Sequence, residues 1–394
     1  MLNKVGVLCT YAFPEGMAPT IRILSYGQGL IENGCSVEVV VFQPKVCDDR
    51  YPLSGYVGGV KYTYSHKRDS SRSTLYKCLV DRPKALFNAL RILRESDRRQ
   101  KFDCILLSFD SPLYMFFFAP VLRFMGFRLG FVGDEFPEPI RRLKNSIPFY
   151  YKWTYKFVYH FISFRVLMTT ALREYYDSVV CVKPTHILCS ILNTGRFDGI
   201  SRRTVSRKYI CYMGNMMLAK DNVDNIIRAF CRICDDFKDI NLHLYGTPDD
   251  KDRDFVQNVI SELKLNDRVF IKGRINYDSV PQVLADAEIL VTSQPNTKRA
   301  AGGFPTKLAE YMMSHTPVIA TDVGEIRNYV HDGETIFMVE PCDDFAYAEK
   351  MKYILTHPCE AKAVSDRAYD YAVRNFGARQ VAEGLVEFLD KTLK

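Results

Sequence analysis

Residues 302–324 constrain the fold of this chain more than any other stretch, because they predict a glycine loop, a helix and a strand in immediate succession. Gly302 and Gly303 allow close approach of the backbone and positive φ values, and Pro305 suits the first helical position, where its missing N–H is not needed. Residues 317–320, Pro-Val-Ile-Ala, then predict a short buried strand of a parallel sheet. The stretch therefore predicts an α/β domain.

The same stretch contains the side chains of a candidate nucleotide site. We expect the loop amides and the helix N-terminus to attract phosphate, and Lys307 in the first turn to reach the same group. Glu310 lies one turn further along, where its carboxylate can accept hydrogen bonds from two ribose hydroxyls. The alternative is a plain helix cap with a solvated glutamate, and spacing alone does not distinguish the two.

The length of the chain predicts two domains of similar size, because 394 residues exceed what one hydrophobic core normally supports. The apolar run near the N-terminus is too short for a signal peptide. The most apolar later segment, residues 112–131, contains Arg123 and Arg128, which are costly in the middle of a bilayer. These patterns predict a cytoplasmic protein without a membrane-spanning helix.

Two clusters of potential metal ligands are more typical of structural roles. Cys231 and Cys234 form a CxxC inside a predicted helix, but no second pair completes a zinc site, so we expect packing in a reducing compartment. Asp249, Asp250 and Asp252 follow a glycine turn and precede a helix, a pattern typical of a solvated helix cap. We therefore predict no metal.

Charge is distributed unevenly between the two halves of the chain. Residues 1–200 contain 27 Lys and Arg against 17 Asp and Glu, whereas residues 201–394 contain 26 against 29. The basic half is expected to meet an anionic partner, either nucleic acid or an anionic membrane surface.

The first half predicts a doubly wound sheet. Residues 4–9, 21–33 and 36–42 predict a strand, a helix and a second strand, a unit that binds ligands at the carboxyl ends of its strands. Residues 178–182 predict the last strand of this domain, and residues 193–208, which contain four arginines, predict the interdomain linker.

Asp134 and Glu135 follow another predicted strand at residues 128–132. Acidic side chains just past a strand end are expected in the cleft of such a sheet. A turn or a helix cap accounts for them as well, so both interpretations stay open.

Residues 141–173 combine basic and aromatic side chains and contain no acid. On a helix, four aromatic residues share a stripe with two lysines beside it: Trp153, Phe157, Phe161 and Phe164, with Lys152 and Lys156. This combination is typical of an interfacial helix at an anionic membrane. The membrane-facing candidates are Arg141, Arg142, Lys144, Lys152, Trp153, Lys156 and Phe157. The alternative is a core helix with solvated lysines; nucleic acid is not expected, because no RNA- or DNA-binding motif is present.

The run Gly-Phe-Pro-Thr-Lys-Leu-Ala-Glu-Tyr-Met at residues 303–312, followed by Pro-Val-Ile-Ala-Thr-Asp-Val-Gly at residues 317–324, resembles the donor-site signature of the group 1 (family 4) glycosyltransferases. The resemblance implies the GT-B architecture, an α/β fold in which two Rossmann-like domains face each other across a cleft. It implies an acceptor-side domain at residues 1–195, a nucleotide-sugar donor domain at residues 206–375, and a C-terminal helix at residues 376–394 that returns to the first domain.

The resemblance also assigns roles to individual residues. Lys220 matches one of two basic residues that grip the donor diphosphate, Asn215 stands at the position of the other, and Lys307 is expected to compensate. The catalytic candidates are Lys220, Lys307 and Glu310. The donor-binding candidates are Gly16, Asn215, Arg274, Gly302, Gly303, Phe304 and Thr306. The acceptor-side candidates are Thr20, Arg22, Asp134 and Glu135; for this loop the alternative is an ordinary βα connection with Arg22 in solvent.

Family members transfer a sugar from a nucleotide diphosphate-sugar with retention at the anomeric carbon and without a metal. The resemblance thus implies a nucleotide-sugar donor, no cofactor, and a lipid-linked or oligosaccharide acceptor in surface polysaccharide biosynthesis, such as capsule or lipopolysaccharide. We expect the protein to be peripheral on the inner face of the cytoplasmic membrane.

Three positions depart from the family pattern. The glutamate expected eight residues before Glu310 is Gly302, the arginine of the diphosphate grip is Asn215, and a helix-end glycine is His315, where an αL conformation is expected. The first two departures favour one alternative, a catalytically silent nucleotide-binding subunit at the membrane. Among enzymes, the alternative is a GT-B-fold nucleotide-sugar epimerase.

Overall fold

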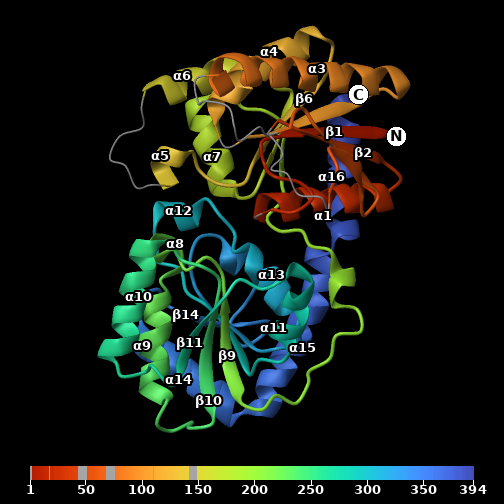
Figure 1. Ribbon diagram of the computed structural model, residues 1–394. Coiled ribbons are helices and arrows are strands. Elements are labelled where there is room, and N and C mark those ends of the chain that lie inside the picture. The colour runs from red at the N-terminus through yellow and green to blue at the C-terminus, as the bar shows by residue number, and fades with distance from the viewer. Residues whose placement is uncertain (1, 17, 43–50, 68–75, 110, 142–148) are drawn as a thin grey trace. The chain divides into compact units, whose positions relative to one another are not determined.

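Figure 1 presents a computed structural model that describes residues 2–16, 18–42, 51–67, 76–109, 111–141 and 149–394. The chain divides into two compact units. The first comprises Met1–Asn193 and Ala378–Lys394, and the second comprises Thr194–Gly377. Each unit builds its own sheet and its own hydrophobic core.

The first unit is built on an eight-stranded sheet in the order β3-β4-β2-β1-β5-β6-β7-β8. The strands are β1 (Lys4–Cys9), β2 (Ser36–Val41), β3 (Ser54–Val57), β4 (Val60–Tyr64), β5 (Cys104–Ser108), β6 (Leu129–Gly133), β7 (Phe164–Leu167) and β8 (Thr185–Ile187). All neighbouring pairs run parallel except β3 and β4. Every residue of β1 and β5 is buried, as expected for a parallel sheet with both faces covered.

The helices of this unit are α1 (Ala18–Glu32), α3 (Arg82–Arg99), α4 (Pro112–Phe124), α5 (Glu138–Arg141), α6 (Phe149–Val158), α7 (Thr170–Val179) and α16 (Ala378–Leu393), and the π-helical turn η1 (Lys77–Asp81) precedes α3. α16 packs on α1, and Ala382, Leu385 and Leu389 join the core of the unit. The last helix of the chain therefore belongs to the first unit and packs on its first helix.

The strand expected at residues 178–182 is not formed. α7 continues to Val179, and the edge strand of the sheet is β8. Leu172 and Tyr176, which lie four residues apart on α7, are both buried. Packing of this helical face therefore outweighs the β-propensity of the Val-Val-Cys-Val run.

The second unit has a six-stranded sheet in the order β11-β10-β9-β12-β13-β14, in which all neighbours are parallel. Its strands are β9 (Lys208–Met213), β10 (Ile240–Tyr245), β11 (Val269–Gly273), β12 (Ile289–Thr292), β13 (Val318–Thr321) and β14 (Phe337–Val339). Its helices are α8 (Leu218–Asp221), α9 (Val223–Ile233), α10 (Asp250–Glu262), α11 (Val280–Ala285), α12 (Lys298–Ala301), α13 (Thr306–Met312), α14 (Asp344–Thr356) and α15 (Pro358–Phe376), with 3₁₀ turns η2 (Thr194–Phe197), η3 (Tyr277–Ser279) and η4 (Ile326–Asn328). The strand predicted at residues 317–320 is confirmed as β13.

The αL conformation expected at His315 is confirmed, with φ of 56°. Its imidazole stacks on the ring of Tyr369, 4.0 Å between centroids, and its Nδ1 lies 2.8 Å from Asp366 Oδ1. Both partners belong to α15. These contacts offset the strain of a non-glycine residue with positive φ.

His243 on β10 makes the stability of the second unit sensitive to acid. Its ring stacks on Tyr209, 4.5 Å between centroids, and its Nδ1 is buried with no hydrogen-bond partner among the described residues. Burial, with a smaller contribution from Lys272, lowers the pKa of His243 to about 4 from its ordinary value of 6.5. Between these two pH values the unfolded chain binds a proton that the folded chain excludes, so the free energy of unfolding falls as pH falls.

We therefore predict that His243→Phe flattens the pH dependence of stability between pH 6.5 and 4, measured as denaturant midpoints across that range. His331→Phe, a change at an exposed position, is the matched control and should retain the wild-type slope. Equal slopes for wild type and His243→Phe would contradict the assignment.

Candidate functional site

The donor-side candidates of the second unit lie along the carboxyl ends of its strands. Asn215 follows β9, Arg274 follows β11 and is exposed, and the loop leading into α13 follows β12. This edge is where parallel α/β sheets bind their ligands. The sheet therefore brings sequence-distant candidates to one side of the unit.

Two glycine turns fix the loops after β9 and β10 against each other. Gly246 has φ of 129°, and a Cβ built on it would lie 1.6 Å from the carbonyl oxygen of Gly214. The N–H of Gly246 donates to the carbonyl of Gly273 at 2.8 Å, which adds the end of β11 to the same junction. Only glycine fits at position 246, because a side chain would force the three loops apart.

Lys307 lies in the first turn of α13, as the sequence predicts, but its ammonium is already paired. Nζ lies 2.7 Å from Asp221 Oδ1, 3.3 Å from the hydroxyl of Tyr212 and 4.5 Å from the centre of the Tyr212 ring. Burial lowers the pKa of Lys307, and the nearby charge of Lys220 lowers it further, whereas Asp221 acts in the opposite direction. The pair with Asp221 thus favours the charged ammonium in a largely buried position.

Asp221 is a partner that the sequence analysis missed. Its side chain is 1% exposed and follows directly after Lys220 in the short α8 turn. Non-glycine residues with positive φ flank that turn, Met216 at 53° and Asn222 at 38°, and the side chain of Met216 is fully buried. The buried pair and this buried side chain hold the strained turn in place, so they position Lys220, which directly precedes Asp221.

Glu310 pairs with Arg196, a residue that the sequence analysis placed only in the linker. Arg196 Nη1 lies 2.5 Å from Glu310 Oε1, and Nη2 donates to the carbonyl of Tyr277 at 2.9 Å. The guanidinium also lies over the Tyr277 ring, 3.4 Å from its centre. Arg196 and Glu310 are 114 positions apart, so no local sequence pattern could have paired them.

The glycine loop before α13 differs from the expectation of free amides and positive φ. Gly302 has φ of −90° and caps α12. The N–H groups of Gly302 and Gly303 donate to the carbonyls of Arg299 and Ala300, each at 3.2 Å. Both amides are therefore satisfied within the loop, and a ligand would have to exchange with these hydrogen bonds.

Other residues of the loop separate into core and surface positions. Pro305 is the N-cap of α13, one position before the predicted one, and Thr306 is exposed at the start of the helix. The ring of Phe304 is buried against Tyr329 and Phe376, with centroids 5.3 and 5.7 Å away. The Phe304 ring therefore anchors the loop in the core.

In the first unit, the acceptor-side candidates lie around the start of α1. The hydroxyl of Thr20 donates to the carbonyl of Ala12 at 2.6 Å. A Cβ on Gly16 would lie 2.2 Å from that hydroxyl oxygen, so glycine at this position makes room for the loop to close. Arg22 is 5% exposed, which excludes the alternative of a solvated arginine.

Arg22 and Asp134 are brought together as an ion pair. Arg22 Nε lies 2.9 Å from Asp134 Oδ1, and the guanidinium also donates to the carbonyls of Leu188 and Cys189. Asp134 is 19% exposed and Glu135 next to it is half-buried. α1, the end of β6 and the segment after β8 thus meet at one polar cluster.

The membrane-facing candidates differ in the exposure of their side chains. Lys152, Trp153 and Lys156 are exposed on α6, whereas Phe157 is half-buried. The stripe expected beyond Phe157 is interrupted, because α6 ends at Val158 and Phe164 is a buried residue of β7. Arg142 and Lys144 lie outside the described residues, as does the side chain of Arg141. No helix within the described ranges is long and apolar enough to cross a bilayer.

The predicted structural roles of the acids and the CxxC pair are confirmed. Asp249 is the N-cap of α10 and accepts a hydrogen bond from the N–H of Asp252 at 2.9 Å. Cys231 and Cys234 are free thiols, and Cys234 lies in the core of the second unit. Among the described residues no group of three or more His, Cys, Asp or Glu side chains could hold a metal ion.

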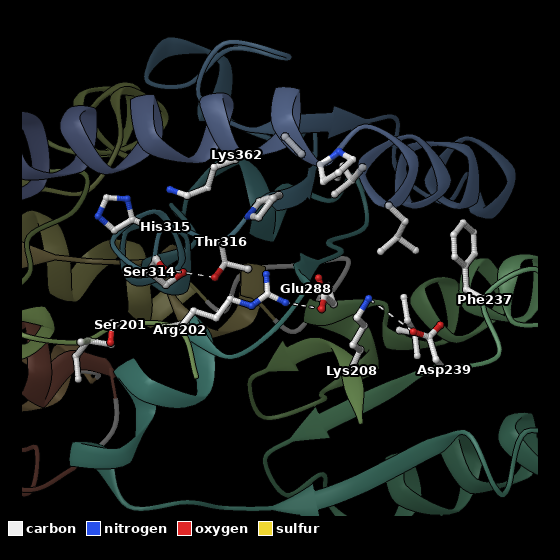
Figure 2. Close-up of a pocket in the computed structure, with 18 residues that line it drawn as sticks. Ser201, Arg202, Lys208, Phe237, Asp239, Glu288, Ser314, His315, Thr316 and Lys362 are labelled. Carbon is white, nitrogen blue, oxygen red and sulfur yellow. Dashed lines mark hydrogen bonds and ion pairs between the residues drawn. The ribbon is translucent and has the colours of Figure 1, made fainter. Parts of the chain in front are cut away.

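A cavity of about 550 Å³ lies at the amino ends of the strands of the same sheet (Figure 2). Its lining includes Lys208 and Ile240, which begin β9 and β10, and Pro317, which precedes β13. The charged side chains at its rim are paired, Arg202 with Glu288 and Lys208 with Asp239. None of the predicted site residues lines this cavity, which is therefore separate from the candidate donor site.

Comparisons with known proteins agree with the fold and the donor-side signature. Residues 196–371 match the family described as Glycosyl transferases group 1. The match lies within the second unit, and it confirms the resemblance inferred from the motif. No curated protein sequence matches the chain significantly.

Solved structures of the same architecture match nearly the whole chain. A sucrose-phosphate synthase from Thermosynechococcus elongatus is 15% identical, with 99% of this chain and 98% of that chain covered and a TM-score of 0.74. Anabaena HepE in complex with UDP and glucose is 12% identical, with coverage of 98% and 99% and a TM-score of 0.69. The lipopolysaccharide outer core galactosyltransferase WaaB is 13% identical, with coverage of 98% and 99% and a TM-score of 0.64. The chain thus has the GT-B architecture, as the sequence predicts, and the family match at residues 196–371 supports glycosyltransferase activity.

We predict that Gly246→Ala lowers the thermal unfolding midpoint more than Gly333→Ala does. Both glycines have positive φ, so both substitutions strain the backbone; at Gly333, whose φ of 71° is near the αL region, the cost is about 1–2 kcal/mol. A Cβ at Gly333 meets nothing within 4 Å, whereas one at Gly246 collides with Gly214. Equal shifts in the two variants would show that the junction of the three loops tolerates a side chain.

Proposed function

We propose that this glycosyltransferase moves a sugar from a nucleotide diphosphate-sugar to a lipid-linked glycan acceptor, with retention at the anomeric carbon and without a metal. The observation that carries the proposal is the cluster at the carboxyl edge of the second sheet. There, Lys307 on α13 pairs with Asp221, the residue that follows Lys220, and Glu310 lies one turn further along α13. The cluster fits a diphosphate followed by a ribose.

The two lysines supply the charge that the reaction needs. When the glycosidic bond to the donor breaks, negative charge grows on the leaving diphosphate, and pre-positioned cations stabilise it more than they stabilise the ground state. Asp221 favours the charged form of Lys307 and holds the adjacent Lys220 turn. Lys307 thus supplies part of the positive charge that is missing because Asn215 stands in place of an arginine.

Glu310 is proposed to accept the hydrogen bonds of the ribose hydroxyls. Without a nucleotide, its carboxylate is satisfied by Arg196. Binding would exchange one set of donors for another, so the carboxylate is never left without partners in a half-buried position. Arg274, exposed after β11, is close in sequence to Tyr277 and is proposed to contact the base or ribose.

The acceptor is proposed to bind in the first unit around Thr20, Asp134 and Glu135, next to Gly16, which is proposed to line the donor side of the loop. Arg22 fixes Asp134 by its ion pair and is therefore a positioning residue there. A dedicated protein base is not required, because in the family's proposed front-face route the departing phosphate takes the proton of the acceptor hydroxyl.

The proposed setting is surface polysaccharide synthesis at the inner face of the cytoplasmic membrane. The exposed Lys152, Trp153 and Lys156 of α6 support attachment to an anionic membrane surface. Among the similar structures, WaaB is a lipopolysaccharide galactosyltransferase and HepE was solved with UDP and glucose, which supports a surface glycan product and a uridine nucleotide.

A second candidate function is a catalytically silent nucleotide-binding subunit. Gly302 in place of a sugar-contacting glutamate and Asn215 in place of an arginine favour it. A GT-B-fold epimerase is distinguished from both by its product, because it needs no acceptor.

We predict that Lys220→Ala and Glu310→Ala each reduce turnover of the cognate donor about 10²–10³-fold, the usual effect of removing one transition-state contact. A panel of nucleotide sugars is incubated with lipid-linked acceptors and EDTA, and released nucleotide is measured. The anomeric configuration of the product, determined by NMR, should match that of the donor.

Lys251→Ala and Glu262→Ala, two exposed positions on α10, are the matched controls and should retain wild-type rates. Unchanged kinetics in Lys220→Ala and Glu310→Ala would refute their assignment. Nucleotide binding without turnover of any donor would favour the silent subunit instead.

A further inference from the structure

Helix α4 presents an apolar surface on both of its sides. Met115, Phe118 and Leu122 are buried against the sheet. The opposite side exposes a second apolar stripe at helical spacing: Leu113, Phe117, Val121 and Phe124, which are 51, 57, 39 and 85% exposed. A helix that is apolar all round is expected in a core or in contact with lipid. Its outer stripe is only partly covered by the described part of the chain, where the ring of Phe124 meets that of Phe161 at 6.3 Å between centroids.

Helix α6 extends this apolar surface. α4 and α6 pack against each other, and the ring of Phe116 joins them, with its centroid 5.7 Å from Trp153 and 4.9 Å from Phe157. Trp153 remains 58% exposed and Phe149, at the start of α6, is 85% exposed. The two helices therefore form one surface, which we call the α4–α6 face; both helices run along the same side of the first unit in Figure 1.

The charges on the α4–α6 face have one sign. Arg123, Arg128, Lys152 and Lys156 are exposed on or next to the two helices. Residues 112–133 and 139–173 contain no Asp or Glu. Large apolar side chains surrounded by cations match the interface of an anionic bilayer, where rings enter the acyl boundary and cations meet headgroup phosphates.

We propose that the α4–α6 face docks on an anionic lipid bilayer, with α4 lying in the plane of the interface and its outer stripe inserted among the lipids. α4 has 13 residues, which corresponds to about 20 Å of helix. A helix needs roughly 20 residues, about 30 Å, to cross a bilayer, so α4 is too short to span and is proposed to lie on the membrane. The inference deepens the proposed function by assigning membrane contact to α4, which the basic pattern of α6 alone does not reveal. The docking proposal rests on the proposed function on one point only, namely that the acceptor is lipid-linked.

The test is co-sedimentation of the full-length protein with large unilamellar vesicles of phosphatidylcholine, alone or with about one third phosphatidylglycerol. Wild type should bind the anionic vesicles. Phe117→Ser/Phe124→Ser should weaken this binding at least tenfold at both low and high salt, because each lost ring removes apolar contact that salt does not screen. Lys152→Gln/Lys156→Gln should weaken binding at low salt and have little further effect at high salt.

Phe345→Ser, which removes a ring that is 61% exposed on α14 of the second unit, is the matched control and should bind like wild type. Failure of wild type to bind anionic vesicles, or full binding by Phe117→Ser/Phe124→Ser, would overturn the proposal. A wild-type dimer that Phe117→Ser/Phe124→Ser converts to a monomer in light scattering, without vesicle binding, would identify a second copy of the chain as the occupant.

Donor hydrolysis in the same samples without vesicles separates this proposal from the proposed function. An active protein that does not bind vesicles would refute the α4–α6 face and the proposed membrane attachment, and would leave the glycosyltransferase assignment intact. A protein that binds vesicles but turns over no donor would refute only the enzymatic assignment.

Discussion

Asp221 is almost fully buried, and an unpaired carboxylate in that position would be strongly destabilising, so the ammonium of Lys307 has to stay within reach of it. This constraint ties α13 to α8, two short elements that lie far apart in the sequence. It fixes the strained turn that carries Lys220, and it keeps a cation in a site where burial alone would favour the neutral amine. The geometry of the candidate donor site follows from this one pair.

The pair between Arg196 and Glu310 applies the same logic to the nucleoside end of the site. A half-buried carboxylate is kept satisfied by a guanidinium that also lies on the Tyr277 ring. In both pairs the protein supplies its own counter-charge, which keeps the site folded in the absence of ligand. At Glu310 a donor would bind by exchange of partners, whereas Lys307 would keep Asp221 as its partner.

Local patterns in the sequence were sufficient for the parts of the fold that depend on local physics. The glycine loop, helix and strand of residues 302–324, the αL conformation at His315 and the cap at Asp249 follow from backbone preferences and were predicted. The motif also identified Lys307 and Glu310. Their partners, Asp221 and Arg196, lie 86 and 114 positions away, and no periodicity reports such pairs.

The failed expectations have related causes. At residues 178–182 a β-branched run lost to the packing of Leu172 and Tyr176, a tertiary effect. The amides of Gly302 and Gly303 were expected to be free, but the short α12 before them offers carbonyl acceptors. The sequence does not predict the outer stripe of α4, because the composition of this helix fits a core helix and only the structure distinguishes its two sides.

The central claim is that Lys307, held by Asp221, is part of the grip on the donor diphosphate. The most direct measurement is calorimetric titration of wild type and Lys307→Met/Asp221→Asn, which leaves no unpaired buried carboxylate, with the best-binding nucleoside diphosphate and with its nucleoside. The account predicts that this double variant weakens diphosphate binding about 10- to 100-fold and leaves nucleoside binding unchanged, as expected for loss of one charged contact in a largely buried site. Equal diphosphate affinity in the two proteins, or equal loss of both ligands, would contradict it.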